Sequence, residues 1–184
     1  GELDWTTSVP TSQFQWAKRN LGQQLRVHPY LGTYYYGFNL TRPPFRDAPK
    51  LRRALSLAID RDIITDKITA AGEIPAYGWV PPAVEGYEPP ELDYADWSQQ
   101  RRNEEARRLY REAGYSRQEP LQVEIRYNTQ EDHKKIAVAI SQMWKQVLGI
   151  DTTLYNEEWK VFLQHRQQQK VTEVFRAGWI GDYN

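Results

Sequence analysis

Three side chains suited to holding a charged ligand lie close together in residues 173–184. Arg176 carries a guanidinium, Asp182 carries a carboxylate, and Trp179 between them offers a broad apolar surface. A guanidinium binds carboxylates through two parallel hydrogen bonds, and a carboxylate binds ammonium groups. Their spacing therefore indicates a site for a zwitterionic ligand.

Simpler structural roles compete with this interpretation. Asp182 is also an ordinary turn residue, and Arg176 has Glu173 or another acid on the sheet face as a possible partner. A carboxylate between Trp179 and Tyr183 is partly desolvated, however, and needs a cation or several donors. No residues follow to cover these two aromatic side chains, so we expect the chain to be a piece of a larger protein.

Composition narrows the possible functions. The 24 lysines and arginines balance 24 aspartates and glutamates, so no overall charge favours nucleic acid, and we expect no nucleic-acid partner. The absence of cysteine excludes disulfide frameworks and thiolate metal sites. No phosphate-binding loop, zinc pattern or nucleophile elbow occurs, so the sequence implies neither metal nor cofactor. The aromatic content of 13% fits either a large core or a site lined by tyrosine and tryptophan.

The first half of the chain is predicted to hold short helices, one strand and a long loop. The helices are expected at 13–20, 51–60 and 61–70, the strand at 33–39, and a stiff loop rich in proline and aromatic residues at 73–95.

The second half alternates strands with helices. A charged helix at 98–114 is followed by strands at 121–127, 150–155 and 171–179, with helices at 129–148 and 157–167 between them. Crossovers of this length predict an α/β fold with a mostly parallel or mixed sheet flanked by helices. Thr129 and Asp132 resemble a capping box for the first of these crossover helices.

Ligands of such open sheets bind beyond the carboxyl ends of the strands. The residues placed there are Asn128, His133, Asn156, Trp159 and Asp182. A solvent-facing, structurally neutral role is the commoner case for a histidine in a first helical turn, although the position of His133 beyond a strand favours binding. Trp159 is expected first on the apolar face of its helix and second as a stacking surface. Arg166 is expected to be exposed.

Six short strings, in order along nearly the whole chain, resemble the periplasmic oligopeptide-binding proteins of bacterial peptide ABC importers, which are extracellular solute-binding proteins of family 5. The strings are 29–36, 60–64, 75–78, 127–129, 158–160 and 177–184. The resemblance implies one lobe of a type II periplasmic-binding-protein clamshell. Residues 1–32 would approach the hinge, and residues 33–184 would form the C-terminal, peptide-binding lobe and end at the second hinge crossing.

The resemblance also implies roles for individual residues in binding an extended peptide without catalysis. Asp182 would hold the N-terminal ammonium of the peptide, whereas Arg176 and His133 would meet its C-terminal carboxylate. The remaining expected ligand-binding residues are Gly178, Trp179 and Ile180, which would pair with the peptide backbone, and Asn128, Trp159, Arg166 and Tyr35 around the side-chain pockets. Gly37 and Thr69 depart from the glutamate and lysine of the best-known members, which implies different ligand preferences.

The implied partners are an oligopeptide, the membrane permease subunits of an ABC importer and the missing N-terminal lobe of the same protein. The implied location is the periplasm, or a lipid-anchored position outside the cell membrane. Two alternatives stay open. One is a hydrolase that uses His133 and Asp182 with a serine or threonine, and the other is a lobe that serves mainly as a protein interaction surface.

Overall fold

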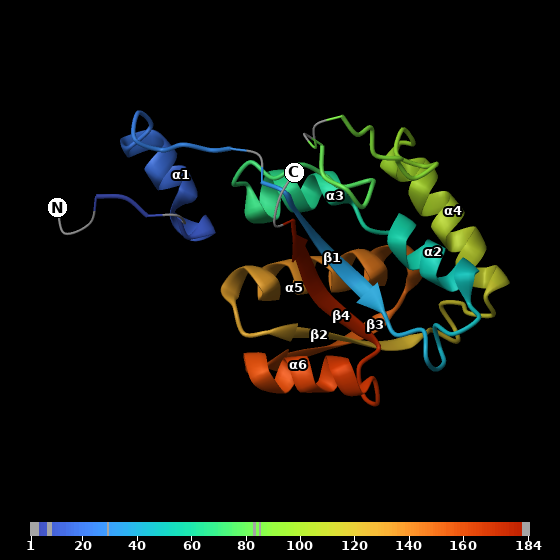
Figure 1. The fold of residues 1–184 in the computed structure, drawn as a ribbon. Coiled ribbons are helices and arrows are strands. Elements are labelled where there is room, and N and C mark those ends of the chain that lie inside the picture. The colour runs from blue at the N-terminus through green and yellow to red at the C-terminus, as the bar shows by residue number, and fades with distance from the viewer. Residues whose placement is uncertain (1–3, 7–8, 29, 83, 85, 182–184) are drawn as a thin grey trace.

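The computed structural model describes residues 4–6, 9–28, 30–82, 84 and 86–181 (Figure 1). A four-stranded sheet lies at its centre with helices on both sides. The strands are β1 (Gly32–Phe38), β2 (Gln122–Asn128), β3 (Asp151–Glu157) and β4 (Val174–Ile180), and their order across the sheet is β1-β4-β2-β3. The predicted α/β fold is confirmed.

The sheet is mixed. β2 runs parallel to both β3 and β4, and β1 runs antiparallel to β4. The parallel strands are joined by the crossover helices α5 (Glu131–Leu148) and α6 (Trp159–Gln168). The chain moves across the sheet in one direction from β2 to β3 and in the opposite direction from β3 to β4. Right-handed crossovers therefore place α5 and α6 on opposite faces of the sheet. Figure 1 shows the two helices on opposite sides of β2.

The main core lies on the α5 face of the sheet. Trp144 of α5 is fully buried, and its indole Nε1 donates a hydrogen bond of 3.0 Å to the Leu55 carbonyl of α2 (Pro49–Leu57). The neighbouring helix α4 (Gln99–Glu112) buries Arg102, Ala106, Leu109 and Tyr110. On the inner face of α5, Ile136, Ile140, Trp144 and Val147 are buried, whereas Met143 is half-buried.

The segment predicted as one helix at 61–70 is helical but changes its geometry. A single turn, α3 (Arg61–Ile63), continues as the π-helix η1 (Ile64–Thr69). The Thr69 hydroxyl donates to Glu73 Oε2 at 2.8 Å and also lies 3.3 Å from the Ile64 carbonyl oxygen and 3.4 Å from that of Thr65. The helix ends at Ala70, which has a positive φ of 50°, and this agrees with the predicted end of the helix.

The predicted capping box of α5 is wrong. Gln130 is the N-cap and makes no side-chain capping bond. The Thr129 hydroxyl instead donates to Asn156 Oδ1 at 2.6 Å and so ties the end of β2 to β3. Asp132 accepts a hydrogen bond from Thr11 of α1 (Thr11–Asn20), the helix that projects to one side of the sheet in Figure 1.

Replacing Trp144 with phenylalanine tests the link between α5 and α2. We expect the free energy of unfolding to fall by about 2 to 3 kcal/mol, because the change leaves a void and removes the donor to the Leu55 carbonyl. Urea denaturation measures it. Val138→Ala, at an exposed position of the same helix, should cost less than about 0.5 kcal/mol. Equal costs for the two variants would contradict the role given to Trp144.

Candidate functional site

Arg176 lies on the α5 face of the sheet, among polar and aromatic side chains. Its guanidinium carbon is 5.0 Å from the centre of the Tyr34 ring, and its Nη1 donates to Asn128 Oδ1 at 3.3 Å. The alternative, an ion pair between Arg176 and Glu173, is wrong for the residues that the structure describes. Glu173 Oε2 instead accepts a hydrogen bond of 2.9 Å from the backbone N–H of Glu124. Arg176 therefore reaches from β4 to the carboxyl end of β2 with no described acid beside it.

His133 packs against the same tyrosine. Only 5% of the residue is exposed, and its Nδ1 is 3.3 Å from the Tyr34 hydroxyl. The expectation of a solvent-facing histidine is wrong, because the first turn of α5 lies against β1. Burial, followed by the charge of Arg176, lowers the pKa of His133 to about 4, although Asp132 opposes the shift. The imidazole is therefore neutral at pH 7.

Two buried polar atoms of this cluster have no hydrogen-bond partner among the residues that the structure describes. They are Arg176 Nε and the Tyr36 hydroxyl. Burial raises the pKa of Tyr36, and the neighbouring Tyr34 side chain raises it further. A buried donor without a partner costs about 1 to 3 kcal/mol. A ligand carboxylate would supply the missing acceptor.

β4 is paired with β2 only at its beginning. The two pairs are Ile125 with Val174 and Arg126 with Phe175. β1, in contrast, accompanies β4 as far as Ile180. Beyond Phe175, the edge of β4 that faces away from β1 has no strand beside it within the described ranges.

The hydrogen bonds to the β1 side show which residues face this open edge. The N–H of Asn39 donates to the Glu173 carbonyl, and the N–H of Gly181 donates to the Leu31 carbonyl. Because backbone groups alternate sides along an antiparallel strand, odd-numbered residues of β4 face β1. Gly178 and Ile180 therefore turn their N–H and C=O groups toward the open edge.

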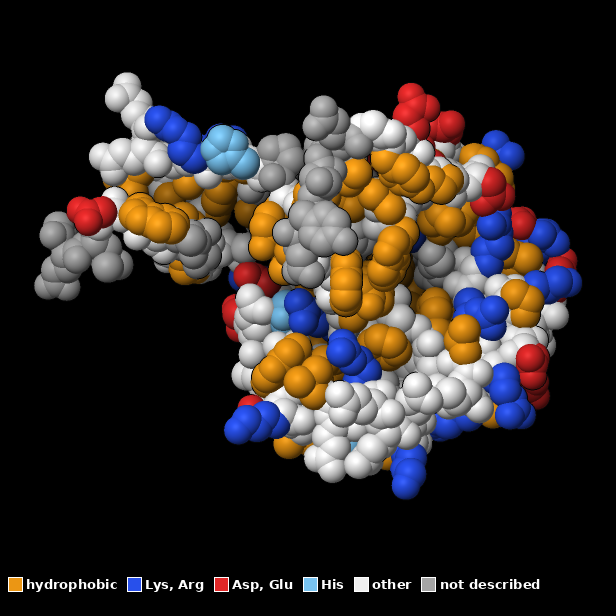
Figure 2. Space-filling view, viewed as in Figure 1, with side chains coloured by type: hydrophobic (Ala, Val, Ile, Leu, Met, Phe, Trp, Pro, Cys, Tyr) orange, Lys and Arg blue, Asp and Glu red, His pale blue; other side chains and the backbone are white. Residues whose placement is uncertain are grey.

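Large apolar side chains surround the end of β4. Trp179 is 64% exposed, and Ile180 and Trp79 are also exposed. The Tyr35 ring lies 4.7 Å from the Trp79 ring, which joins the loop at 73–95 to β1. Figure 2 shows hydrophobic side chains gathered on this face, with cationic side chains beside them.

Tyr35 and Arg166 belong to the opposite, α6 face of the sheet. Both line a groove of about 470 Å³ between β1, α6 and the start of β4. The guanidinium of Arg166 lies 6.0 Å from the Phe175 ring centre and 5.9 Å from that of Phe162. Arg166 is half-buried rather than exposed, because it covers these two rings.

Trp159 stands apart from both groups. It is 47% exposed at the first position of α6, and its ring stacks on Phe162 with a centroid distance of 6.1 Å. The apolar face of α6 is instead covered at Phe162, which is buried, and at Leu163, which is half-buried. The first expectation for Trp159 is therefore wrong, and its ring is available as a stacking surface.

The structure thus divides the predicted site into distinct groups. Arg176, His133 and Asn128 come together, and residues 178–180 form the open edge nearby. Asp182 lies outside the described residues. The sequence reasoning missed Tyr34 and Tyr36 because three consecutive tyrosines give no indication of which face each one occupies.

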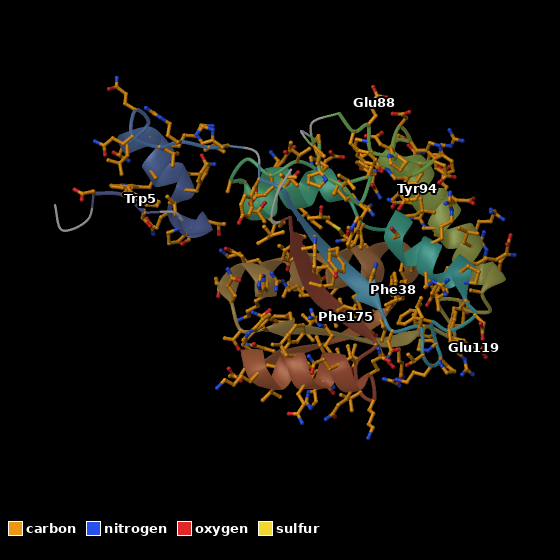
Figure 3. All side chains as sticks on the ribbon, in the orientation of Figure 1. Trp5, Phe38, Glu88, Tyr94, Glu119 and Phe175 are labelled. Atoms are coloured by element: carbon orange, nitrogen blue, oxygen red, sulfur yellow. The ribbon has the colours of Figure 1, made fainter. Side chains whose placement is uncertain are left out.

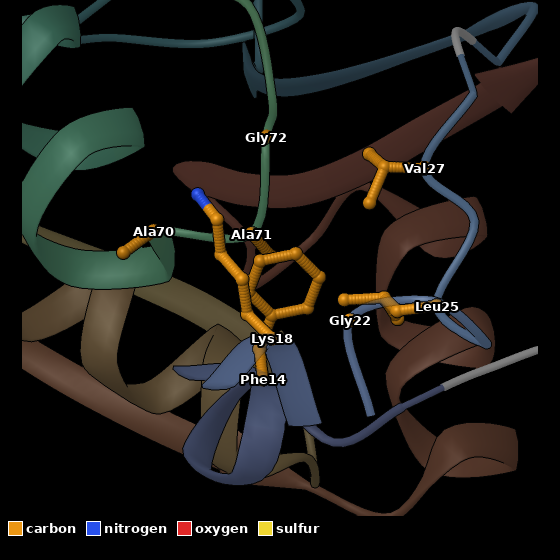
Figure 4. A pocket seen from close by; sticks show the side chains of 8 residues that line it. All are labelled: Phe14, Lys18, Gly22, Leu25, Val27, Ala70, Ala71 and Gly72. Atoms are coloured by element: carbon orange, nitrogen blue, oxygen red, sulfur yellow. The ribbon is translucent and has the colours of Figure 1, made fainter. Parts of the chain in front are cut away.

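A further cavity of about 440 Å³ lies between α1 and the residues that follow η1 (Figure 4). Its lining is mostly apolar, with Phe14, Leu25 and Val27 on one side and residues 70–72 on the other. No group of three or more His, Cys, Asp or Glu residues in the described ranges is arranged to hold a metal ion. None of the described helices has the length and apolar character needed to cross a membrane.

The low pKa of His133 predicts a specific pH dependence of stability. The pKa of His133 is 6.5 in the unfolded chain and about 4 in the folded protein. At pH values between these two, unfolding takes up a proton. Acidification in this range therefore lowers the free energy of unfolding, by at most about 1.4 kcal/mol per pH unit. His133→Asn lacks this contribution. Urea denaturation between pH 7.5 and 4.5 should show that the advantage of the unchanged protein over the variant shrinks as pH falls. Parallel pH profiles would contradict a buried neutral imidazole.

Comparison with known proteins agrees with this geometry. All 184 residues match the family described as bacterial extracellular solute-binding proteins, family 5 Middle. The periplasmic oligopeptide-binding protein OppA of Escherichia coli is 46% identical over the whole chain, and the periplasmic murein peptide-binding protein MppA of the same organism is 40% identical. The chain spans about a third of the length of these relatives, 34% of each.

Solved structures give the same result. The murein tripeptide binding protein MppA of Escherichia coli superposes with a TM-score of 0.92 at 40% identity, covering 100% of this chain and 36% of that one. Haemophilus influenzae OppA in complex with the peptide RPPGFSPFR superposes with a TM-score of 0.87 at 40% identity, covering 96% of this chain and 35% of that one. The chain therefore belongs to the bacterial extracellular solute-binding proteins of family 5.

Proposed function

We propose that this chain is the peptide-binding part of the substrate-binding component of an oligopeptide ABC import system. The observation that carries the proposal is the open edge of β4 beside the half-buried Arg176, which forms no ion pair with a described acid. An extended peptide added to this edge satisfies backbone groups whatever its side chains are, and its carboxylate meets the guanidinium. Recognition through backbone and termini suits a carrier of many different peptides.

Each group of residues has a role in this proposal. Gly178 and Ile180 pair with the peptide backbone, and Trp179 covers it. Arg176, together with Asn128 and the neutral His133, receives the C-terminal carboxylate. Asp182, by its resemblance to the family, holds the N-terminal ammonium. The rings of Trp159 and Tyr35 and the Arg166 side chain contact peptide side chains.

The relatives support a peptide as the ligand. Two of the similar structures are named for peptide binding, one as a murein tripeptide binding protein and the other as a complex with RPPGFSPFR. Because the chain spans about a third of the length of its relatives, we propose that residues 33–184 form one lobe and that residues 1–32 approach the hinge. The missing N-terminal lobe would then cover Trp179 and Ile180, and membrane permease subunits would receive the loaded protein in the periplasm or at a lipid anchor.

Binding without catalysis fits the surroundings of His133. Its Nδ1 contacts the Tyr34 hydroxyl rather than a serine or threonine, and the depressed pKa makes the imidazole a weak base. A hydrolase built on His133 and Asp182 therefore has little support. Turnover of a peptide library by the complete protein would revive it.

The role of Asp182 can be measured in the complete protein. We expect Asp182→Ala to weaken binding of a tripeptide by about 10- to 100-fold, because the ammonium loses a charged hydrogen-bond partner. Isothermal titration calorimetry with the free tripeptide and its N-acetylated form provides the test. The acetylated peptide should bind both proteins equally weakly. Unchanged affinity for the free tripeptide, or an equal loss for both peptides, would disprove this role.

The opposite end of the peptide tests Arg176. We expect Arg176→Met to weaken binding of a tripeptide carboxylate by about 10- to 100-fold but to change binding of the C-terminal amide much less. Arg111→Met, on the exposed side of α4, is the matched control and should bind both forms normally. Equal losses for carboxylate and amide would show that Arg176 supports the fold rather than the ligand.

A further inference from the structure

The first turn of α5 carries His133 but has no side-chain cap in the described part of the chain. Gln130 is the N-cap residue, and its side chain does not bond the turn that follows. A capping side chain normally ties the first turn of a helix to the residue before it. The position of this turn, and of the imidazole on it, therefore depends on contacts with other elements.

Two described contacts hold the turn from outside, one from β3 and one from α1. The backbone N–H of Thr129 donates to the Glu157 carbonyl at 2.8 Å, beside the bond from the Thr129 hydroxyl to β3 described above. From the other element, the Thr11 hydroxyl donates to the carboxylate of Asp132. The acceptor of the second bond is charged, which makes such bonds roughly twice as strong as neutral ones.

The other ion pair of Asp132 lies within α5. Lys135 Nζ is 3.6 Å from Asp132 Oδ1, three residues further along the same helix, so this pair does not attach the turn to anything else. Thr11 is therefore the described side chain that fixes Asp132 to another element. Because Asp132 directly precedes His133, a change at Thr11 is passed to the imidazole through a single peptide unit.

α1 is itself attached by few polar contacts. Gln15 Nε2 donates to the Ala70 carbonyl at the end of η1 at 3.0 Å. Phe14 is buried but lies outside the main core, and it lines the cavity between α1 and the end of η1 (Figure 4). Figure 3 shows Trp5, which precedes α1, well apart from Phe175 on the sheet. The hydrogen bond of Thr11 is thus a principal tie between this helix and the ligand-binding face.

We propose that Thr11 and Asp132 are positioning residues for peptide binding, because their hydrogen bond holds the first turn of α5 where His133 meets the peptide carboxylate. The inference rests on the proposed peptide-binding function and adds α1 to it. His133 must contact the ligand while its Nδ1 stays 3.3 Å from the Tyr34 hydroxyl. Since hydrogen bonds weaken steeply as their angles close, a small shift of the turn lowers the affinity for the carboxylate.

Thr11→Val tests the inference, because valine keeps the shape of threonine and lacks the donor. Calorimetric titrations of the complete protein with a tripeptide and with its C-terminal amide give the ratio of the two affinities. We expect the variant to bind the carboxylate form about 5-fold more weakly and the amide almost normally. Thr11→Ser keeps the donor and should retain the ratio. Ser12→Ala, at the next and exposed position of α1, is the matched control and should also retain it.

The His133→Asn background shows whether Thr11 acts through the imidazole. Thr11→Val should cause no further loss of carboxylate affinity there, because two residues that act as one unit are not additive. An unchanged ratio in Thr11→Val overturns the inference while the proposed function stands. An equal loss for carboxylate and amide, or the same loss in the His133→Asn background, also overturns it, since α1 then supports the fold. If the unchanged protein binds neither peptide, the proposed function fails and the inference fails with it.

Discussion

The limited pairing between β4 and β2 is the constraint on which the site depends. β4 lies between β1 and β2 at its start, where Val174 is fully buried, and then continues with β1 alone. The buried beginning anchors the strand, whereas the later residues have one free backbone edge. A central strand of a sheet normally has both edges satisfied, so an edge left open at the carboxyl end of the sheet is where a ligand strand can add.

The electrostatics of the α5 face follow from the same arrangement. Because β4 places Arg176 opposite Tyr36 and close to Tyr34, the residue is half-buried and its Nε atom is buried. A second cation in this space would be repelled, and the low pKa of His133 reflects both burial and that repulsion. One permanent cation beside a neutral imidazole can accept an anion while leaving the free site with a single positive charge.

Much of the fold could be predicted from the sequence, because periodicity reports directly on burial. The apolar spacing of α5 and the alternation along β2 located both elements to within about two residues. The hydrogen-bond partners of side chains near the start of a helix could not be predicted in the same way. Thr129 and Asp132 have suitable spacing for a capping box, but their partners, Asn156 and Thr11, are distant in sequence. A pattern within four residues carries no information about such contacts.

Part of the candidate site could be predicted from the positions of the strand ends. Position after a strand end identified Asn128 and His133, since strand ends converge in a parallel sheet. It did not separate the two faces, and the family resemblance placed Arg166 and Tyr35 around the same pockets as Asn128, although they line the groove on the α6 face. Strand pairing between β1 and β4 decides that division, and it joins residues more than 130 positions apart.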